Sequence, residues 1–130
     1  MDTDDSGSET VAAAILFALA LLLVLSIVQA GLWWHARDLV STAAQEGADA
    51  ARTLTGTTTH GQDTAASFLR RAGDGMLSDP AVHATGDTTR VQVSVSAAVL
   101  QVLPIPGLDL RVSATAHAAK ERWTTPGGLP

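Results

Sequence analysis

The sequence contains no cysteine, few aromatic residues and no basic residue before Arg37. Without cysteine, neither disulfide bonds nor thiolate metal sites can stabilise a small domain. Aromatic residues make up 4% of the chain and no basic stripe occurs, so the composition excludes nucleic-acid binding. The net charge of −5 is uneven, because four acidic residues precede the first basic one: Asp2, Asp4, Asp5 and Glu9.

Charge is also absent between Glu9 and His35, where the sequence VAAAILFALALLLVLSIV occupies residues 11–28. An α-helix rises 1.5 Å per residue, so roughly 20 apolar residues cross the hydrocarbon core of a bilayer. The core helix of a soluble protein rarely stays apolar on all faces over this length. The run therefore predicts a transmembrane helix over residues 9–34, with the lipid bilayer as its partner.

A secretory signal peptide is the alternative interpretation of the first thirty residues. In its favour, the tripeptide Val28-Gln29-Ala30 resembles a small-x-small cleavage site. Against it, a signal peptide begins with positive charge, whereas this chain begins with acids only and its apolar run is longer than usual. Under this alternative the chain is a secreted binding protein that is cleaved after Ala30 and begins at Gly31.

Two tryptophans and an arginine follow the apolar run. Indole rings favour the membrane–water interface, and a charged residue just beyond them marks the aqueous side. We therefore predict a membrane interface at Trp33, Trp34 and Arg37. The alternative is that the tryptophans pack against the soluble part of the chain.

The helix is predicted to continue outside the membrane over residues 35–55, where no proline interrupts it. Small and apolar residues recur there at steps of three and four, which is typical of a helix-packing seam. The residues predicted to pack are Ala36, Val40, Ala43, Gly47, Ala50, Ala51 and Leu54. Their partner is either the chain's own C-terminal domain or a neighbouring subunit, in a homo- or hetero-oligomer formed through the helix.

A small head domain is predicted over residues 56–123, between the long helix and the C-terminus. Turn-forming residues predict a loop over residues 55–62, and Asp63 with Thr64 is predicted to cap a short helix that residues 78–80 close. The chain ends are predicted to be an acidic tail or leader over residues 1–8 and a flexible tail over residues 124–130.

Alternating apolar and polar residues predict strands after the short helix. The predicted strands are residues 82–85, 90–99 and 108–118, with a tight turn at Gly86 and Asp87. One apolar face per strand suits an antiparallel sheet packed on a helix. The predicted fold class is α+β: a long N-terminal transmembrane helix that extends into a small domain with a short helix and a two- to three-stranded antiparallel sheet.

The segment LQVLPIPG at residues 100–107 separates the last two predicted strands. It is too apolar for an ordinary surface loop, and its prolines exclude a central strand. Three roles fit this segment: it covers the end of the core, touches the membrane surface, or contacts a partner.

No pattern of residues indicates catalysis. The four histidines, His35, His60, His83 and His117, lack metal-ligand spacing, although His83 and His117 are candidates for neighbours across strands. No nucleophile elbow, phosphate loop or dinucleotide fingerprint occurs. We expect no enzymatic activity and no cofactor. A membrane-bound enzyme is the third class considered, and turnover of a substrate by the purified chain would indicate it.

Three stretches together carry a family resemblance. The first runs from Asp5 through Gly7 and Ser8 into the apolar helix. The second is residues 29–37 followed by AAQEGADAA at residues 43–51, and the third is the pair of strands that flank residues 100–108. In this order they resemble the TadE family of bacterial pseudopilins of the tight-adherence (Flp) pilus. The resemblance implies a pilin-like head and the role of a minor structural subunit in a Tad-type pilus or related secretion apparatus.

The resemblance also implies a topology and partners. The N-terminus would be cytoplasmic, and a single span in the cell membrane would precede an extracytoplasmic head. A prepilin peptidase would cut between Gly7 and Ser8, and other pilin-like subunits or Tad assembly proteins would be partners. Arg37 by itself favours the opposite orientation, because basic residues flank the cytoplasmic side of a span. Pilin-like proteins usually carry a glutamate five residues after the cut, where this chain has Ala12.

Overall fold

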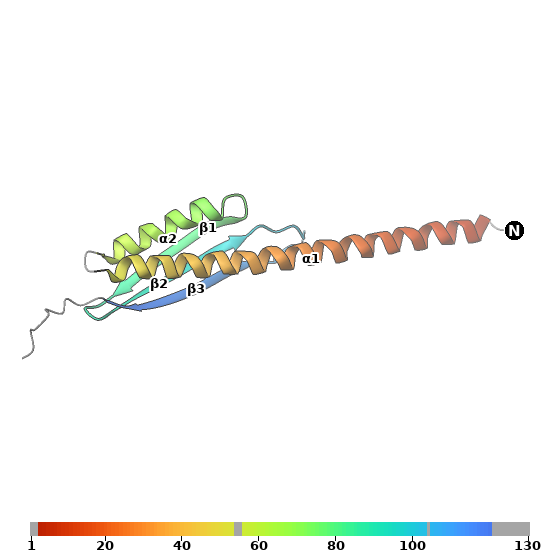
Figure 1. Cartoon of the computed structure of the whole chain (residues 1–130). Coiled ribbons are helices and arrows are strands. Elements are labelled where there is room, and N and C mark those ends of the chain that lie inside the picture. Colours follow the sequence, from red (N-terminus) through yellow and green to blue (C-terminus); the bar gives the residue numbers. More distant parts are fainter. Residues whose placement is uncertain (1–2, 54–55, 104, 121–130) are drawn as a thin grey trace, which may run out of the picture.

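The computed structural model describes residues 3–53, 56–103 and 105–120. Its first element is the helix α1, Thr3–Arg52, whose 50 residues give a length of about 75 Å at 1.5 Å per residue. Figure 1 shows α1 extending well beyond the head domain, with its N-terminal half projecting alone. The predicted continuation of the membrane helix into the head is therefore confirmed.

The ends of α1 differ from the sequence prediction. A tail was predicted over residues 1–8, but α1 begins at Thr3. Once a helix is nucleated, each added residue gains a hydrogen bond without a new nucleation cost, and no proline blocks extension here. At the other end α1 finishes at Arg52, and Leu54 lies outside the described residues.

The second helix, α2, spans Thr58–Ala72 and begins earlier than predicted. The predicted loop over residues 55–62 is therefore wrong from Thr58 onward, and the predicted cap at Asp63 and Thr64 is wrong. The true cap is Thr57, whose hydroxyl oxygen accepts a hydrogen bond of 3.0 Å from the His60 backbone N–H. Helix propensity alone does not predict this first turn, because the turn contains Gly61. In the structure Gly61 is buried against α1, and this packing favours the helix.

Three strands form an antiparallel sheet in the order β1-β2-β3. They are β1 (Leu77–Gly86), β2 (Arg90–Val99) and β3 (Arg111–Ala119). The predicted bounds of β2 are confirmed, whereas β1 is longer than predicted and β3 begins three residues later than predicted. His83 and His117 are not neighbours across strands, because β2 lies between β1 and β3.

The start of β1 was the least predictable part of the sheet. Residues 78–80 were predicted to close the helix, but they belong to this edge strand, with a register shift between Ser78 and Ala81. A bulge on an edge strand tolerates Pro80, which has no N–H to donate. Asp79 adopts a positive φ of 48° there, and Arg111 binds its carboxylate at 3.1 Å.

The two helices cover one face of the sheet, so the head has two layers (Figure 1). The core between the layers contains alternate residues of β2, among them Val91, Val93 and Val95, all at most 1% exposed. The opposite face of the sheet is polar and bears no helix among the described residues. The predicted alternation of inward and outward residues in β2 is therefore confirmed.

Candidate functional site

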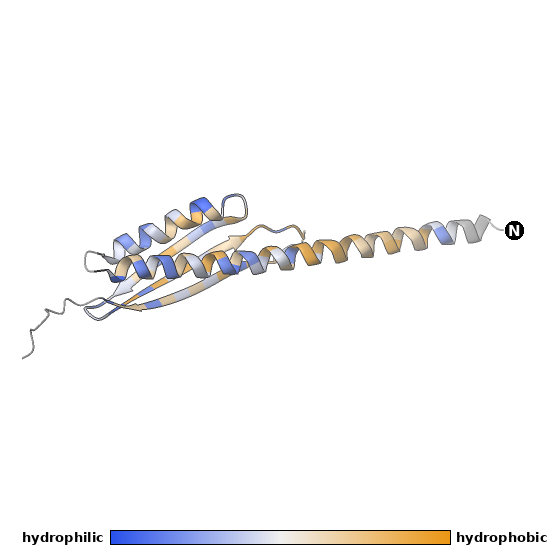
Figure 2. Cartoon of the chain, viewed as in Figure 1, coloured by the Kyte–Doolittle hydropathy of each residue, from blue (hydrophilic) through white to orange (hydrophobic). Residues whose placement is uncertain are grey.

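The helix α1 consists of two halves with opposite surroundings. From Gly7 to Val28 every residue is exposed except the half-buried Leu25, and Phe17 is 72% exposed. Figure 2 shows most of this half in orange, as a hydrophobic stretch of helix outside the head. Within the described residues, α1 is the one helix long and apolar enough to cross a membrane. An exposed apolar surface of this extent requires a covering, and its length suits a bilayer. The described part of the chain thus indicates a single-pass membrane protein.

The second half of α1 is buried in the chain's own head. The predicted seam residues Ala36, Val40, Ala43 and Ala51 are fully buried, and Gly47 is buried with them. Among the described seam residues only Ala50 is half-buried. Of the two partners considered for the seam, the chain's own C-terminal domain covers it.

The crossing of α1 and α2 is closest at two glycines. A Cβ added to Gly47 would lie 2.8 Å from the backbone oxygen of Gly61, and one added to Gly61 would lie 2.6 Å from the oxygen of Gly47. Real Cβ atoms do not approach backbone oxygens this closely, so the two helices meet backbone to backbone. The small-residue row read from the sequence thus brings two helices of one chain together.

The predicted membrane-interface residues separate onto two faces of α1. Trp33 is half-buried and packs against the core, and the Arg37 guanidinium lies 5.7 Å from the centre of its ring. Trp34 points elsewhere and is 70% exposed. Of the two tryptophans, only Trp34 therefore offers most of its surface to a surrounding interface.

Gln29 has a structural role that was not predicted from the sequence. Its side chain is 6% exposed, and its amide nitrogen donates to the carbonyl of Leu100 at 3.1 Å. Its amide oxygen accepts from the backbone N–H groups of Val102, at 2.7 Å, and Leu103, at 3.4 Å. Gln29 thus joins the end of the apolar helix to the segment between β2 and β3. Its signal in the sequence is that it is the only amide side chain between Glu9 and Trp33.

The predicted cleavage residues Gly7 and Ser8 lie near the N-terminus of α1. Both are exposed, and a Cβ added to Gly7 would meet no atom within 4 Å. Neither residue contributes to the head domain. The peptide bond between them is part of the helical backbone of α1, on an exposed stretch.

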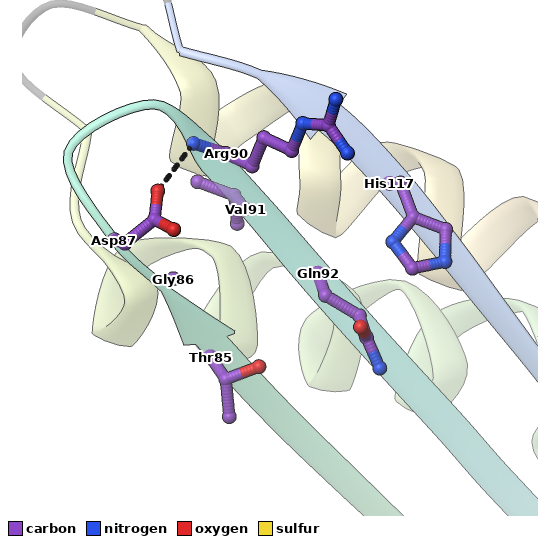
Figure 3. A pocket seen from close by; sticks show the side chains of 7 residues that line it. All are labelled: Thr85, Gly86, Asp87, Arg90, Val91, Gln92 and His117. Carbon is purple, nitrogen blue, oxygen red and sulfur yellow. Dashed lines mark hydrogen bonds between the residues drawn. The ribbon is translucent and has the colours of Figure 1, made fainter.

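A hollow lies in the head near the turn between β1 and β2 (Figure 3). It has a volume of about 460 Å³, is open to solvent, and is lined by seven residues: Thr85, Gly86, Asp87, Arg90, Val91, Gln92 and His117. Among the described residues, no group of three metal-ligating side chains occurs here or elsewhere.

Asp87 has a structural role at the rim of this hollow. Hydrogen bonds from the Thr89 backbone N–H, the Thr89 hydroxyl and the Arg90 backbone N–H lower the pKa of its carboxyl to about 2. Figure 3 shows the bond to Arg90. The carboxylate thus closes the turn that was predicted at Gly86 and Asp87.

The family comparison applies to α1. A family model described as TadE-like protein matches residues 7–49. This part of the chain is TadE-like. The resemblance seen in the sequence is confirmed over this range, and it supports an involvement with Tad pilus systems. The TadE-like segment contains the exposed half of α1 and most of the half that packs on the head. No curated protein and no solved structure matches the chain significantly.

Proposed function

We propose that this chain is a membrane-anchored pseudopilin, a minor structural subunit of a Tad-type pilus or a related secretion apparatus. One observation carries the proposal: the TadE-like segment coincides with a helix whose first half is exposed and whose second half is buried in the head domain. We call the exposed half, residues 7–28, the bare half of α1. Such a helix anchors the subunit in the bilayer while it presents the head outside. The proposed role is assembly and involves no catalysis and no cofactor.

The packing of Gln29 argues against the alternative of a secreted protein. Signal peptidase cleavage after Ala30 would remove Gln29 together with the apolar run. The head would then lose the acceptor for the Val102 N–H and the donor to the Leu100 carbonyl. A cleaved signal peptide does not normally supply buried contacts to the mature domain, so we favour retention of this segment.

The proposed topology places the N-terminus in the cytoplasm and the head outside. We also propose that a prepilin peptidase cuts between Gly7 and Ser8, since both lie on an exposed stretch beside the apolar run. The other partners would be pilin-like subunits or Tad assembly proteins. Contacts between subunits would use the bare half of α1, because the seam of the other half is occupied by the chain's own head.

The mature N-terminus in fractionated cells tests this function. With the peptidase present, we expect a membrane-bound chain that begins at Ser8. Gly7→Leu should abolish this processing, whereas Ala30→Leu, a matched change at the signal-peptidase site, should leave it unchanged.

The opposite pattern would contradict the proposal. A chain that begins at Gly31 in the soluble fraction, with processing sensitive to Ala30→Leu alone, would identify a secreted protein. A membrane-bound chain that stays uncut would remove the processing step from the proposal and leave an anchored subunit. Loss of pili in a deletion strain, restored by the intact gene, would support the assembly role.

A further inference from the structure

The segment between β2 and β3 exposes apolar side chains beside the membrane helix. Residues 100–108 contain no charged residue. Leu100 and Ile105 are each 49% exposed, and Leu108 is 36% exposed. In a soluble head, such a cluster on one loop is unusual, because large exposed apolar patches mark contact surfaces. We call residues 100–108 the apolar loop.

Gln29 fixes the level of the apolar loop along α1. Its side-chain amide holds Leu100, Val102 and Leu103 by the hydrogen bonds described above. One turn deeper on the same helix face lies Leu25, the one residue between Gly7 and Val28 that is half-buried rather than exposed. The face of α1 that carries Gln29 is therefore partly covered within the apolar run as well, at Leu25. Figure 1 shows the loop, in cyan, beside α1 where the helix leaves the head.

This level coincides with the expected bilayer surface. Residues 11–28 span about 27 Å at 1.5 Å per residue, close to the roughly 30 Å of a hydrocarbon core. A bilayer that covers this run must therefore end near Gln29, and its headgroup region must surround the apolar loop. Charge resumes only at Asp109, after the loop.

The backbone of the apolar loop is suited to this environment. Irregular backbone is tolerated near lipid only where its polar groups are satisfied within the protein. The N–H groups of five loop residues are bonded: Leu100, Val102, Leu103, Ile105 and Leu108. Pro104 and Pro106 have no N–H to satisfy. The loop thus exposes apolar side chains, whereas most of its backbone N–H groups already donate hydrogen bonds within the protein.

We propose that the apolar loop inserts Leu100, Ile105 and Leu108 into the interfacial region of the bilayer as a second membrane contact beside α1. Together, α1 and the loop would fix the tilt of the head on the membrane and its rotation about the axis of α1. A single helix would leave that rotation free. The occupant is the lipid surface, because Gln29 holds the exposed apolar residues of the loop at the end of the apolar run, where a bilayer that covers the run has its surface. The proposal needs membrane insertion of α1, and holds for either orientation and for any role of the head.

Depth-dependent quenching of a fluorophore on the loop tests the proposal. The chain has no cysteine, so Ile105→Cys in the full-length protein provides a single attachment site for an environment-sensitive label. The labelled chain is placed in phosphatidylcholine nanodiscs, which leave both bilayer faces accessible. We expect quenching by lipids with a spin label at the headgroup, and iodide quenching about threefold weaker than for a label in solvent.

Two controls separate the possible outcomes. Thr88→Cys, in the exposed turn between β1 and β2, should be quenched by iodide and not by spin-labelled lipid. Phe17→Cys, within the bare half of α1, should be quenched by lipids labelled deep in the acyl chain. Leu108→Cys repeats the loop measurement at a second position, in case the label at Ile105 disturbs the loop.

The results distinguish failure of this inference from failure of the membrane anchor. If the label at position 17 reports insertion while both loop labels behave like the one at position 88, the loop proposal is wrong and the anchor stands. If shielding of the loop labels requires several chains in one nanodisc, the loop contacts a second copy, which also overturns the proposal. Quenching by headgroup-labelled lipid with one chain per nanodisc would establish it.

Discussion

At the scale of single residues, Gln29 connects the membrane segment to the head. A glutamine at the end of an apolar run ordinarily looks like the first residue in the headgroup region. Here its amide is buried, and it supplies both a donor and an acceptor to backbone groups some seventy positions away. A buried amide near lipid is stable only when it is paired in this way.

Replacement of Gln29 by leucine should destabilise this junction. Gln29→Leu leaves the Val102 N–H and the Leu100 carbonyl without their partner, at a cost of about 1–3 kcal/mol in the free energy of unfolding. Unfolding of the full chain in detergent micelles measures the loss, and amide hydrogen exchange at Val102 and Leu103 localises it. Gln45→Leu, on an exposed face of the same helix, should have little effect. Equal effects of the two changes would show that the junction contributes no stability.

Asp87 makes the stability of the head dependent on acidic pH. The pKa of its carboxyl falls from 3.8 to about 2 on folding, chiefly because the Thr89 backbone N–H donates to the charged form. This stabilisation is fully present above about pH 4 and is lost as the pH falls through about 2. We expect Asp87→Asn to be less stable than the parent at pH 7 and to lose less stability between pH 4 and pH 2.

Titration of the carboxyl by NMR checks the cause of this pKa shift. Thr89→Val removes the hydroxyl donor and keeps the backbone donor, so the pKa of Asp87 should rise part of the way toward its ordinary value. A pKa that stays at about 2 would assign the shift to the backbone groups alone.

At the scale of elements, the crossing of α1 and α2 depends on the absence of side chains. Gly47 and Gly61 allow the two helix backbones to touch. This contact lies in the first turn of α2, so the helix begins earlier than its own sequence predicts. A glycine inside a helix costs about 0.5–1 kcal/mol relative to alanine. The close approach offsets this cost through packing of the adjoining core.

Two glycine-to-alanine changes in the same helix should therefore have opposite effects. At Gly31 nothing lies within 4 Å of an added Cβ, so Gly31→Ala should stabilise the chain by about 0.5–1 kcal/mol through helix propensity. At Gly47 the added methyl meets the Gly61 backbone oxygen, and overpacking of about 1–3 kcal/mol should exceed that gain. Chemical unfolding in micelles compares the two, and stabilisation by both changes would mean that the helix crossing relaxes freely.

At the scale of the whole molecule, the chain is a rod with a head, and the two parts share one helix (Figure 1). Among the described residues, the apolar surface of the bare half of α1 is exposed except at the half-buried Leu25. The head covers the other half with its own sheet and second helix, which leaves the polar sheet face toward solvent. In the proposed role, contacts with other subunits would use the bare half of α1 within the membrane, and the polar sheet face is exposed outside it.

The proposed orientation predicts which side of the membrane the head occupies. The single cysteine of the Thr88→Cys variant should react with a membrane-impermeant maleimide added outside an intact cell membrane, because the head lies outside the cytoplasm in the proposed topology. A cysteine at Ser8→Cys in the uncut Gly7→Leu variant should react only after the membrane is permeabilised. Reversed reactivity would support the orientation that Arg37 alone favours.

The sequence by itself determined the features that depend on local periodicity. The length of residues 11–28 gives the span, the alternation in residues 90–99 gives β2 with its buried face, and the spacing from Ala36 to Ala51 gives the buried seam of α1. Each of these patterns is repeated over several turns or residue pairs. A repeated pattern still predicts the element when single positions depart from it.

Only the tertiary structure decided which surfaces meet. It assigned the seam of α1 to the chain's own head, placed β2 between β1 and β3, and buried Gln29 beneath the apolar loop. These contacts join residues far apart in the sequence, and each rests on one or two side chains rather than on a repeated pattern. Hydrophobicity along the chain indicates that a residue will be covered, whereas complementary shape and paired hydrogen-bonding groups determine what covers it.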